Sequence, residues 1–225
     1  MRKRWFMVPV FLILLVVDLI FRFYPSDFDL RLLTSPPVLI CLMIYYFLNS
    51  QSKPREERIM VFIALTSLMI GQMLLISGQN ISTAVIALTL FTIAMVSYSF
   101  IFYRNSDGNI KRAIPFILIS SLITIGVLYF LYDSLQRYYL PLLIYVITLI
   151  YTLQGAYMRY NQVNTESFYL VLLGTLFFIF SQMIDGLNMF GHIGTARLGI
   201  IMLFYAMSQF MIIHGILVEH KQLAK

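Results

Sequence analysis

The sequence predicts an all-α integral membrane protein, a bundle of eight transmembrane helices with both termini on the cytoplasmic side. Of the 225 residues, 60% are hydrophobic and only 12% are charged, with a mean hydropathy of +0.84. A soluble domain is about half apolar and a quarter charged. Apolar runs long enough to cross a bilayer recur along the whole chain. The basic residues between these runs alternate between the two sides, as membrane topology requires.

The apolar runs are separated by loops of a few to about ten residues, which make successive helices antiparallel neighbours. No linker composition interrupts them, so we expect a single domain over residues 1–225. The expected spans are at about 5–23, 33–48, 59–77, 82–103, 113–132, 138–158, 167–190 and 198–218.

The first run follows a basic start and resembles a signal peptide, but it is too long for one and has no small-x-small cleavage site. We therefore expect an uncleaved first helix, in which Asp18 pairs with Arg22 one turn further along. The second run is the shortest and begins with Pro36-Pro37. The first turn of a helix tolerates proline because its N–H groups lack partners anyway.

The distribution of basic residues orients the bundle. With the N-terminus inside, twelve of the 16 Lys and Arg residues fall in cytoplasmic segments, and Arg22, Arg31, Arg137 and Arg197 fall outside. This excess on one side fits the positive-inside rule for an even number of spans. The length and short loops suit a multi-pass protein of the bacterial inner membrane, although an internal eukaryotic membrane satisfies the same charge count.

Several function classes are excluded. The net charge of +6 is scattered through loops without a basic stripe or zinc motif, so nucleic acid is not an expected partner. His192, His214 and His220 lack metal-ligand spacing, and we expect no metal and no cofactor. The chain has no nucleophile elbow, P-loop or dinucleotide fingerprint. Cys41 lies in an apolar run, which predicts a buried structural thiol.

The seventh apolar run carries four polar residues, Ser181, Gln182, Asp185 and Asn188. On a helix the first three share one broad face. A carboxylate in hydrocarbon costs about 2.5 kcal/mol or more, and it usually faces a cavity or a partner. Asp185 is therefore the candidate catalytic residue. The amides have a simpler interpretation, since Gln and Asn often hydrogen-bond between membrane helices.

Small and polar residues also recur in a fixed order along the spans, at Thr34-Ser35-Pro36, Gly71-Gln72, Ala94-Met95 with Tyr98, Gly174, Phe178, Ser181 and Phe190, and Tyr205 with Ser208-Gln209. This order resembles that of the lysoplasmalogenase-like family, also called YhhN, whose members are small eight-span membrane proteins. The resemblance implies the same fold and an intramembrane cavity of the size of a lipid.

The departures from the family pattern fall on its reactive residues. Gln72 and Gln182 stand at the two family aspartates, Met95 at the histidine and Ser35 at the lysine. The family resembles hydrolases that cleave the vinyl ether of lysoplasmalogens to an aldehyde and a glycerophospho-head group. Such cleavage needs an acid and a base. An amide keeps the shape of a carboxylate but transfers no proton near neutral pH.

Three interpretations follow. The chain keeps the family cavity and binds a lysophospholipid or similar amphiphile without cleaving it; or it remains an ether hydrolase that uses Asp185; or it is a non-catalytic membrane partner or sensor subunit. The sequence leaves the oligomeric state open, and membrane lipids surround the bundle in every case. The expected ligand-binding residues are Gln72, Tyr98, Ser181, Gln182, Asn188, Tyr205 and Gln209.

Overall fold

The computed structural model describes residues 6–23, 28–77, 80–104, 106, 114–118, 121–122, 125–126, 129, 139–190 and 196–220. The side chains of residues 23, 28–29, 81, 139, 187–190 and 196–197 lie outside this description. The fold is all-α, as predicted, and the long helices of the described chain are α1 (Met7–Phe23), α2 (Phe28–Asn49), α3 (Arg55–Ser77), α4 (Ile81–Arg104), α6 (Tyr139–Met158), α7 (Thr165–Phe190) and α8 (Ala196–Leu217).

Six helical segments are long and apolar enough to cross a membrane, and they define an integral multi-pass protein. They are Leu30–Asn49, Arg55–Ser77, Ser82–Arg104, Leu140–Met158, Thr165–Gly186 and Leu198–Leu217. Helix α1, the first predicted span, has 17 residues and is about 25 Å long at 1.5 Å per residue. Half of the predicted fifth span, 113–132, lies outside the described residues.

The start predicted for the second span was wrong. Helix α2 begins at Phe28, so Pro36 and Pro37 lie inside it. Proline inside a helix removes a backbone donor, but in membrane helices neighbouring side chains and helices can satisfy the freed groups. Two hydroxyl side chains, Thr34 and Ser35, directly precede the prolines and contact α1. The sequence prediction therefore placed the helix start too late, because it took the two prolines as the first residues of the helix.

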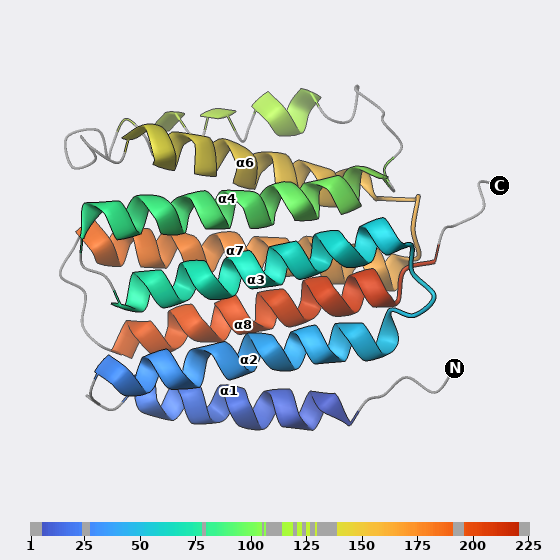
Figure 1. Cartoon of the computed structure of the whole chain (residues 1–225). Coiled ribbons are helices and arrows are strands. Elements are labelled where there is room, and N and C mark those ends of the chain that lie inside the picture. The colour runs from blue at the N-terminus through green and yellow to red at the C-terminus, as the bar shows by residue number, and fades with distance from the viewer. Residues whose placement is uncertain are drawn as a thin grey trace.

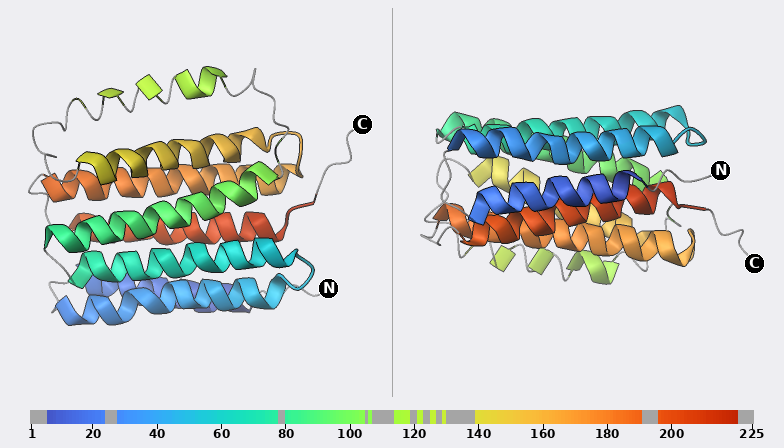
Figure 2. Two further views of the ribbon diagram at one scale, coloured as in Figure 1. Left: turned by 45° about the horizontal axis from the view of Figure 1, so that its top comes forward. Right: turned by 90° about the horizontal axis from the view of Figure 1, so that it is seen from below.

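The helices run along one common axis (Figures 1 and 2). Helix α1 packs on α2 and α8, α3 lies against α2 and α4, and α6 packs between α4 and α7, while α7 packs chiefly on α8. We call the right-hand end of the bundle in Figure 1, where α1 begins and α8 ends, the Arg159 end. The opposite end, where α1 ends and α8 begins, is the Arg22 end.

Close packing of α7 on α8 depends on two glycines. A Cβ added at Gly174 would lie 3.0 Å from the Ser208 carbonyl oxygen, and one added at Gly215 would lie 3.1 Å from the Val171 backbone nitrogen. Small residues allow such approach of membrane helices, where van der Waals packing drives association. The backbones of α7 and α8 therefore approach each other closely at these two glycines.

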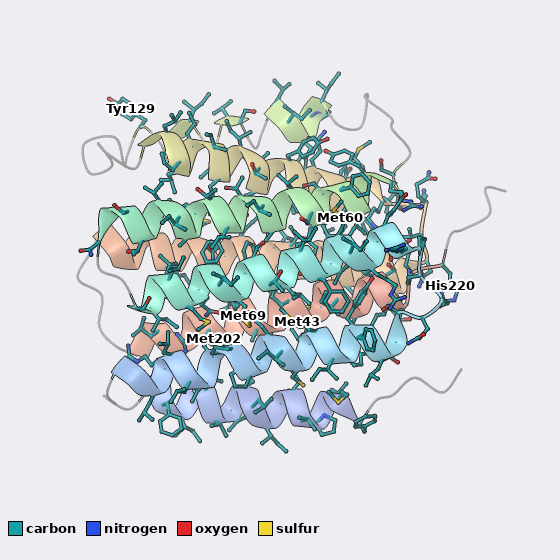
Figure 3. All side chains as sticks on the ribbon, viewed as in Figure 1. Met43, Met60, Met69, Tyr129, Met202 and His220 are labelled. Atoms are coloured by element: carbon teal, nitrogen blue, oxygen red, sulfur yellow. The ribbon has the colours of Figure 1, made fainter. Side chains whose placement is uncertain are left out.

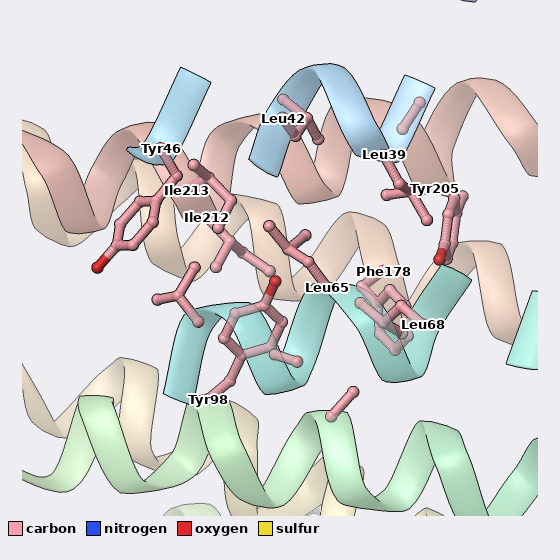
Figure 4. Packing of buried hydrophobic residues seen from close by; sticks show 14 of the residues in the cluster. Leu39, Leu42, Tyr46, Leu65, Leu68, Tyr98, Phe178, Tyr205, Ile212 and Ile213 are labelled. Carbon is pink, nitrogen blue, oxygen red and sulfur yellow. The ribbon is translucent and has the colours of Figure 1, made fainter. Parts of the chain in front are cut away.

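The core lies on the bundle axis, and large apolar side chains also cover the outside. Tyr98 lies in the core between Tyr46 and Tyr205, which lie toward opposite ends (Figure 4). On the outside, Ile13 is 63% exposed and Leu33 is 69% exposed. Exposed apolar surface of this extent is expected where lipid replaces water as the solvent. Cys41 is buried, as predicted.

Candidate ligand-binding site

The predicted site residues of α7 and α8 lie on matching faces of the two helices. On α7, Ser181, Gln182 and Asp185 lie within about one turn of one another. On α8, Tyr205 and Gln209 are also one turn apart. Ser181, Tyr205 and Gln209 are buried in the bundle, whereas Gln182 and Asp185 are partly buried.

Gln182 binds a tyrosine that the sequence did not single out. The Tyr145 hydroxyl on α6 donates to Gln182 Oε1 at 2.8 Å. Ser181, one residue earlier, turns to α8, and its Oγ donates to the Ile201 carbonyl oxygen at 3.0 Å. Gln182 thus joins α7 to α6, whereas Ser181 joins α7 to α8.

Gln72 reaches the same end of the bundle from α3. Its Nε2 lies 3.4 Å from Met202 Sδ on α8, a weak contact. Its Oε1 is buried and has no hydrogen-bond partner among the described residues. Met202 lies in the half of the bundle toward the Arg22 end (Figure 3). Gly71 beside Gln72 lets α4 approach, because a Cβ there would lie 2.7 Å from Phe91 Cε1.

Tyr205 lies one turn beyond Met202 on α8. It is 2% exposed, and its hydroxyl also has no hydrogen-bond partner in the described part of the chain. Its ring packs on Phe178 of α7, with centroids 5.9 Å apart. A buried hydroxyl and a buried amide oxygen thus lack partners at the Arg22 end, and buried polar groups without partners are unfavourable.

Arg22 brings a cation to this end from α1. Its Nε donates to Asp18 Oδ2 at 2.7 Å, which confirms the predicted pair, and its Nη2 donates to Ser35 Oγ on α2 at 3.3 Å. Thr34 Oγ1 donates to the other carboxylate oxygen of Asp18 at 2.6 Å. Both charged side chains are buried. The ion pair therefore joins α1 to α2 inside the bundle and is not a solvated surface pair.

Asp185 lies near this cation but is not bound to it. The carboxylate is partly buried and makes no hydrogen bond or ion pair within the described residues. Arg22 and Tyr145 lie within electrostatic range of it, and Arg22 is also within range of Tyr205. We call this group the Arg22-end cluster; its members are Arg22, Gln72, Tyr145, Gln182, Asp185 and Tyr205.

Tyr98 and Gln209 form a separate pair nearer the middle of the bundle. The Tyr98 hydroxyl donates to Gln209 Oε1 at 2.8 Å, and Gln209 Nε2 donates to Ser208 Oγ at 3.3 Å. Tyr98 and Gln209 are fully buried. Their hydrogen-bonding groups are engaged with each other, so they join α4 to α8 and do not face the Arg22-end cluster as open groups.

The remaining predicted site residue is Asn188, and its side chain is outside the described residues. Within the described ranges, no group of three His, Cys, Asp or Glu side chains is placed to hold a metal ion. A groove of about 620 Å³ lies on α4 toward the Arg159 end, lined by Glu56, Val96, Ser99, Phe100, Tyr103, Arg104 and Tyr151. It includes none of the predicted site residues.

Sequence reasoning missed Arg22 and Tyr145 as members of the site. Arg22 was assigned only to its neighbour Asp18, because a sequence shows the i+4 partner but not the residue across the helix interface. Tyr145 is one of 15 tyrosines in the chain and has no distinguishing local pattern. Only the packing of α6 on α7 makes it the partner of Gln182.

The fold and the buried polar cluster define a multi-pass helical membrane protein with hydrogen-bonding groups in its interior. Residues 30–216 match the YhhN family, and the chain belongs to that family. The predicted family resemblance is therefore confirmed. No curated protein and no solved structure matches the chain.

Proposed function

We propose that the protein binds the polar head of an amphiphile, such as a lysophospholipid, at the Arg22-end cluster and does not cleave a vinyl ether. The observation that carries this proposal is the pair of buried polar atoms without described partners, Gln72 Oε1 and the Tyr205 hydroxyl. Their hydrogen-bonding capacity suits a polar group that enters from outside the chain.

The residue types argue against the reaction that the family resemblance implies. Vinyl-ether hydrolysis requires proton transfer to carbon and activation of water. Gln72 and Gln182 can do neither, since an amide does not titrate near neutral pH. Gln182 instead accepts a hydrogen bond from Tyr145. These contacts favour binding of a head group over cleavage of the vinyl ether.

A second candidate is an ether hydrolase that uses Asp185. The observation in its favour is a partly buried carboxylate with no hydrogen bond in the described chain and a guanidinium, Arg22, within electrostatic range. A carboxylate placed in this way is typical of functional sites in membrane proteins. Under a third interpretation, a non-catalytic partner or sensor subunit, the same residues would only hold helices together.

The topology belongs to this proposal. We propose a single domain of eight spans with both termini in the cytoplasm, which the charge count supports and which includes the six spanning segments. The length and the short loops suit a bacterial inner membrane. In that arrangement the Arg22-end cluster lies toward the outer leaflet. A reporter fused after Ser77, in the predicted second outer loop, tests it.

The experiment for binding is thermal unfolding of the purified protein in detergent with increasing lysophospholipid. A ligand that binds only the folded state raises the midpoint, and the rise grows with concentration. Gln72→Leu and Tyr205→Phe should reduce the rise, whereas Thr89→Val, on the exposed face of α4, should not. No rise at saturating lysolipid in the unmodified protein would reject the binding proposal.

A parallel measurement of aldehyde release from a lysoplasmalogen distinguishes the binding proposal from the ether hydrolase. The binding proposal expects no aldehyde above a protein-free control. Aldehyde release that depends on the protein would replace it with the hydrolase.

A further inference from the structure

A second group of buried polar side chains lies at the Arg159 end. Arg159 directly follows α6 and is 0% exposed, the largest fully buried side chain in the described chain. Its Nη2 donates to Ser167 Oγ at 2.9 Å and to Glu219 Oε2 at 2.6 Å. Its guanidinium carbon lies 5.5 Å from the centroid of the Phe102 ring. Arg159 thus contacts α4, α7 and the segment that follows α8.

The carboxylate on Arg159 comes from a short tail, residues 218–220, that is fastened to the turn between α6 and α7. The Asn164 backbone N–H donates to the His220 carbonyl oxygen at 3.0 Å, and the His220 N–H donates to Asn164 Oδ1 at 2.9 Å. His220 lies at the Arg159 end in Figure 3. Asn161 has a φ of 63°, a left-handed conformation that asparagine tolerates, and it helps the turn to reverse. This fastening places Glu219 against the guanidinium.

The guanidinium has more donors than this arrangement uses. Both Nε and Nη1 of Arg159 are buried without a hydrogen-bond partner in the described parts of the chain. The same holds for the hydroxyl of Tyr46, which is fully buried on α2 and lies within electrostatic range of Glu57 and Glu219. Burial lowers the pKa of Arg159 because it removes water from the cation, and Glu219 opposes this effect. Unsatisfied donors of a buried cation call for acceptor oxygens.

The charges around Arg159 indicate which kind of acceptor fits. Glu57 lies within electrostatic range of Arg159 and pairs with Lys53 at 3.4 Å. Arg159 and Lys53 thus face two carboxylates, Glu57 and Glu219. Two further cations lie within electrostatic range of the group, Arg104 of Glu57 and Arg58 of the Tyr46 hydroxyl. Withdrawal of Glu219 would leave an excess positive charge beside unpaired N–H groups. A guanidinium binds carboxylate or phosphate oxygens through two parallel hydrogen bonds.

We propose that Arg159 is the centre of a second ligand site, for an oxyanion such as a phosphate group, which Glu219 fills as an internal ligand. The phosphate oxygens accept hydrogen bonds from Arg159 and from the Tyr46 hydroxyl, and the phosphate displaces the Glu219 carboxylate. Residues 218–220 then lose the ion pair with Arg159 and keep the hydrogen bonds between His220 and Asn164. Free phosphate and the phosphate of a lipid head group share this chemistry, and the site lies at one end of the bundle, where both are available.

The test uses the purified full chain in detergent and inorganic phosphate, with sodium chloride of equal ionic strength as the reference. Glu219→Gln keeps the shape of the side chain but removes the competing charge. We expect it to bind phosphate at least about tenfold more tightly than the unmodified chain, measured from the rise in unfolding midpoint with concentration. Adding Arg159→Lys to Glu219→Gln should abolish the gain, because an ammonium lacks the planar fork. Arg55→Gln is the matched control, an exposed arginine at the same end.

An equal phosphate response in Glu219→Gln and the unmodified chain would overturn the proposal. So would a response that survives Arg159→Lys. A further arm adds monomeric short-chain phosphatidic acid to Glu219→Gln and identifies the source. A larger rise in unfolding midpoint than with the same concentration of phosphate assigns the site to a lipid head group, and a rise no larger assigns it to the free anion. If Glu219→Gln does not fold, amide exchange of residues 218–220 in the unmodified chain replaces it. Phosphate should speed this exchange relative to chloride, and equal rates would reject the site.

Discussion

Arg22 Nη2 on α1 donates to Ser35 Oγ on α2 at 3.3 Å. The sequence resemblance predicts that Ser35 stands at the lysine of the family pattern, and here a cation reaches Ser35 from the neighbouring helix. The Asp18 carboxylate holds the guanidinium from one side and is itself held by Thr34. The Arg22-end cluster therefore contains a fixed positive charge, although Ser35 itself is neutral.

The first prediction concerns this buried ion pair. Asp18→Asn should lower the free energy of unfolding by about 3 kcal/mol, because it leaves the Arg22 cation buried without its counter-charge. Chemical unfolding in mixed detergent micelles measures the loss. Glu166→Gln, an exposed acid in the first turn of α7, is the control and should change little. The double change Asp18→Asn with Arg22→Gln should cost less than the sum of the single changes. Additive losses would mean that the pair is not coupled.

The second prediction concerns the contact of α6 with α7. Tyr145→Phe removes the donor to Gln182 Oε1 and should destabilise the bundle by about 1 kcal/mol, the usual range for hydrogen bonds between membrane helices. The same unfolding experiment measures it. Tyr129→Phe, at a tyrosine that is 86% exposed, should have no effect. Equal stability of the two variants would show that the Tyr145 hydrogen bond contributes nothing.

The sequence predicted most of the membrane helices because hydropathy reports a length requirement that the bilayer imposes on each span separately. It misplaced the start of α2 because Pro36 and Pro37 usually mark a boundary. Here the helix continues through them, beside the contacts of Thr34 and Ser35 with α1. A contact between two helices cannot be recognised from the sequence of either helix alone.

The polar residues likewise include some that the sequence identified and some that only the structure shows. Asp185 was singled out because a carboxylate in an apolar run is conspicuous. Gln72 and Gln182 were singled out because the sequence around them resembles a family pattern. Arg159 was counted with the cytoplasmic loop charges, yet it is fully buried. Its burial depends on a carboxylate sixty residues away in the chain. Sequence position indicates that a charge follows a helix, but not that the chain folds back over it.

The third prediction separates binding from catalysis at Asp185. If the cluster only recognises a head group, Asp185→Asn should retain the rise in unfolding midpoint produced by lysophospholipid, since the amide preserves the shape and most of the hydrogen-bonding capacity. Neither form should release aldehyde from a lysoplasmalogen. Aldehyde release by the unmodified chain that Asp185→Asn abolishes would instead assign the carboxylate a direct role in cleavage.

The fourth prediction concerns two glycines of α7 that differ in their surroundings. A Cβ at Gly174 would lie 2.9 Å from Ile212 Cγ1 and 3.0 Å from the Ser208 carbonyl oxygen, whereas one at Gly186 meets no atom of the described chain within 4 Å. Gly174→Ala should therefore force α7 away from α8 and cost about 1–3 kcal/mol in free energy of unfolding. Gly186→Ala should be neutral or stabilising by up to about 1 kcal/mol, because alanine favours the helix over glycine. Both variants replace glycine by alanine in the same helix, so their propensity effects are similar. The difference between their losses of unfolding free energy therefore measures the packing of α7 on α8. Equal effects would show that α7 and α8 do not depend on their close approach at Gly174.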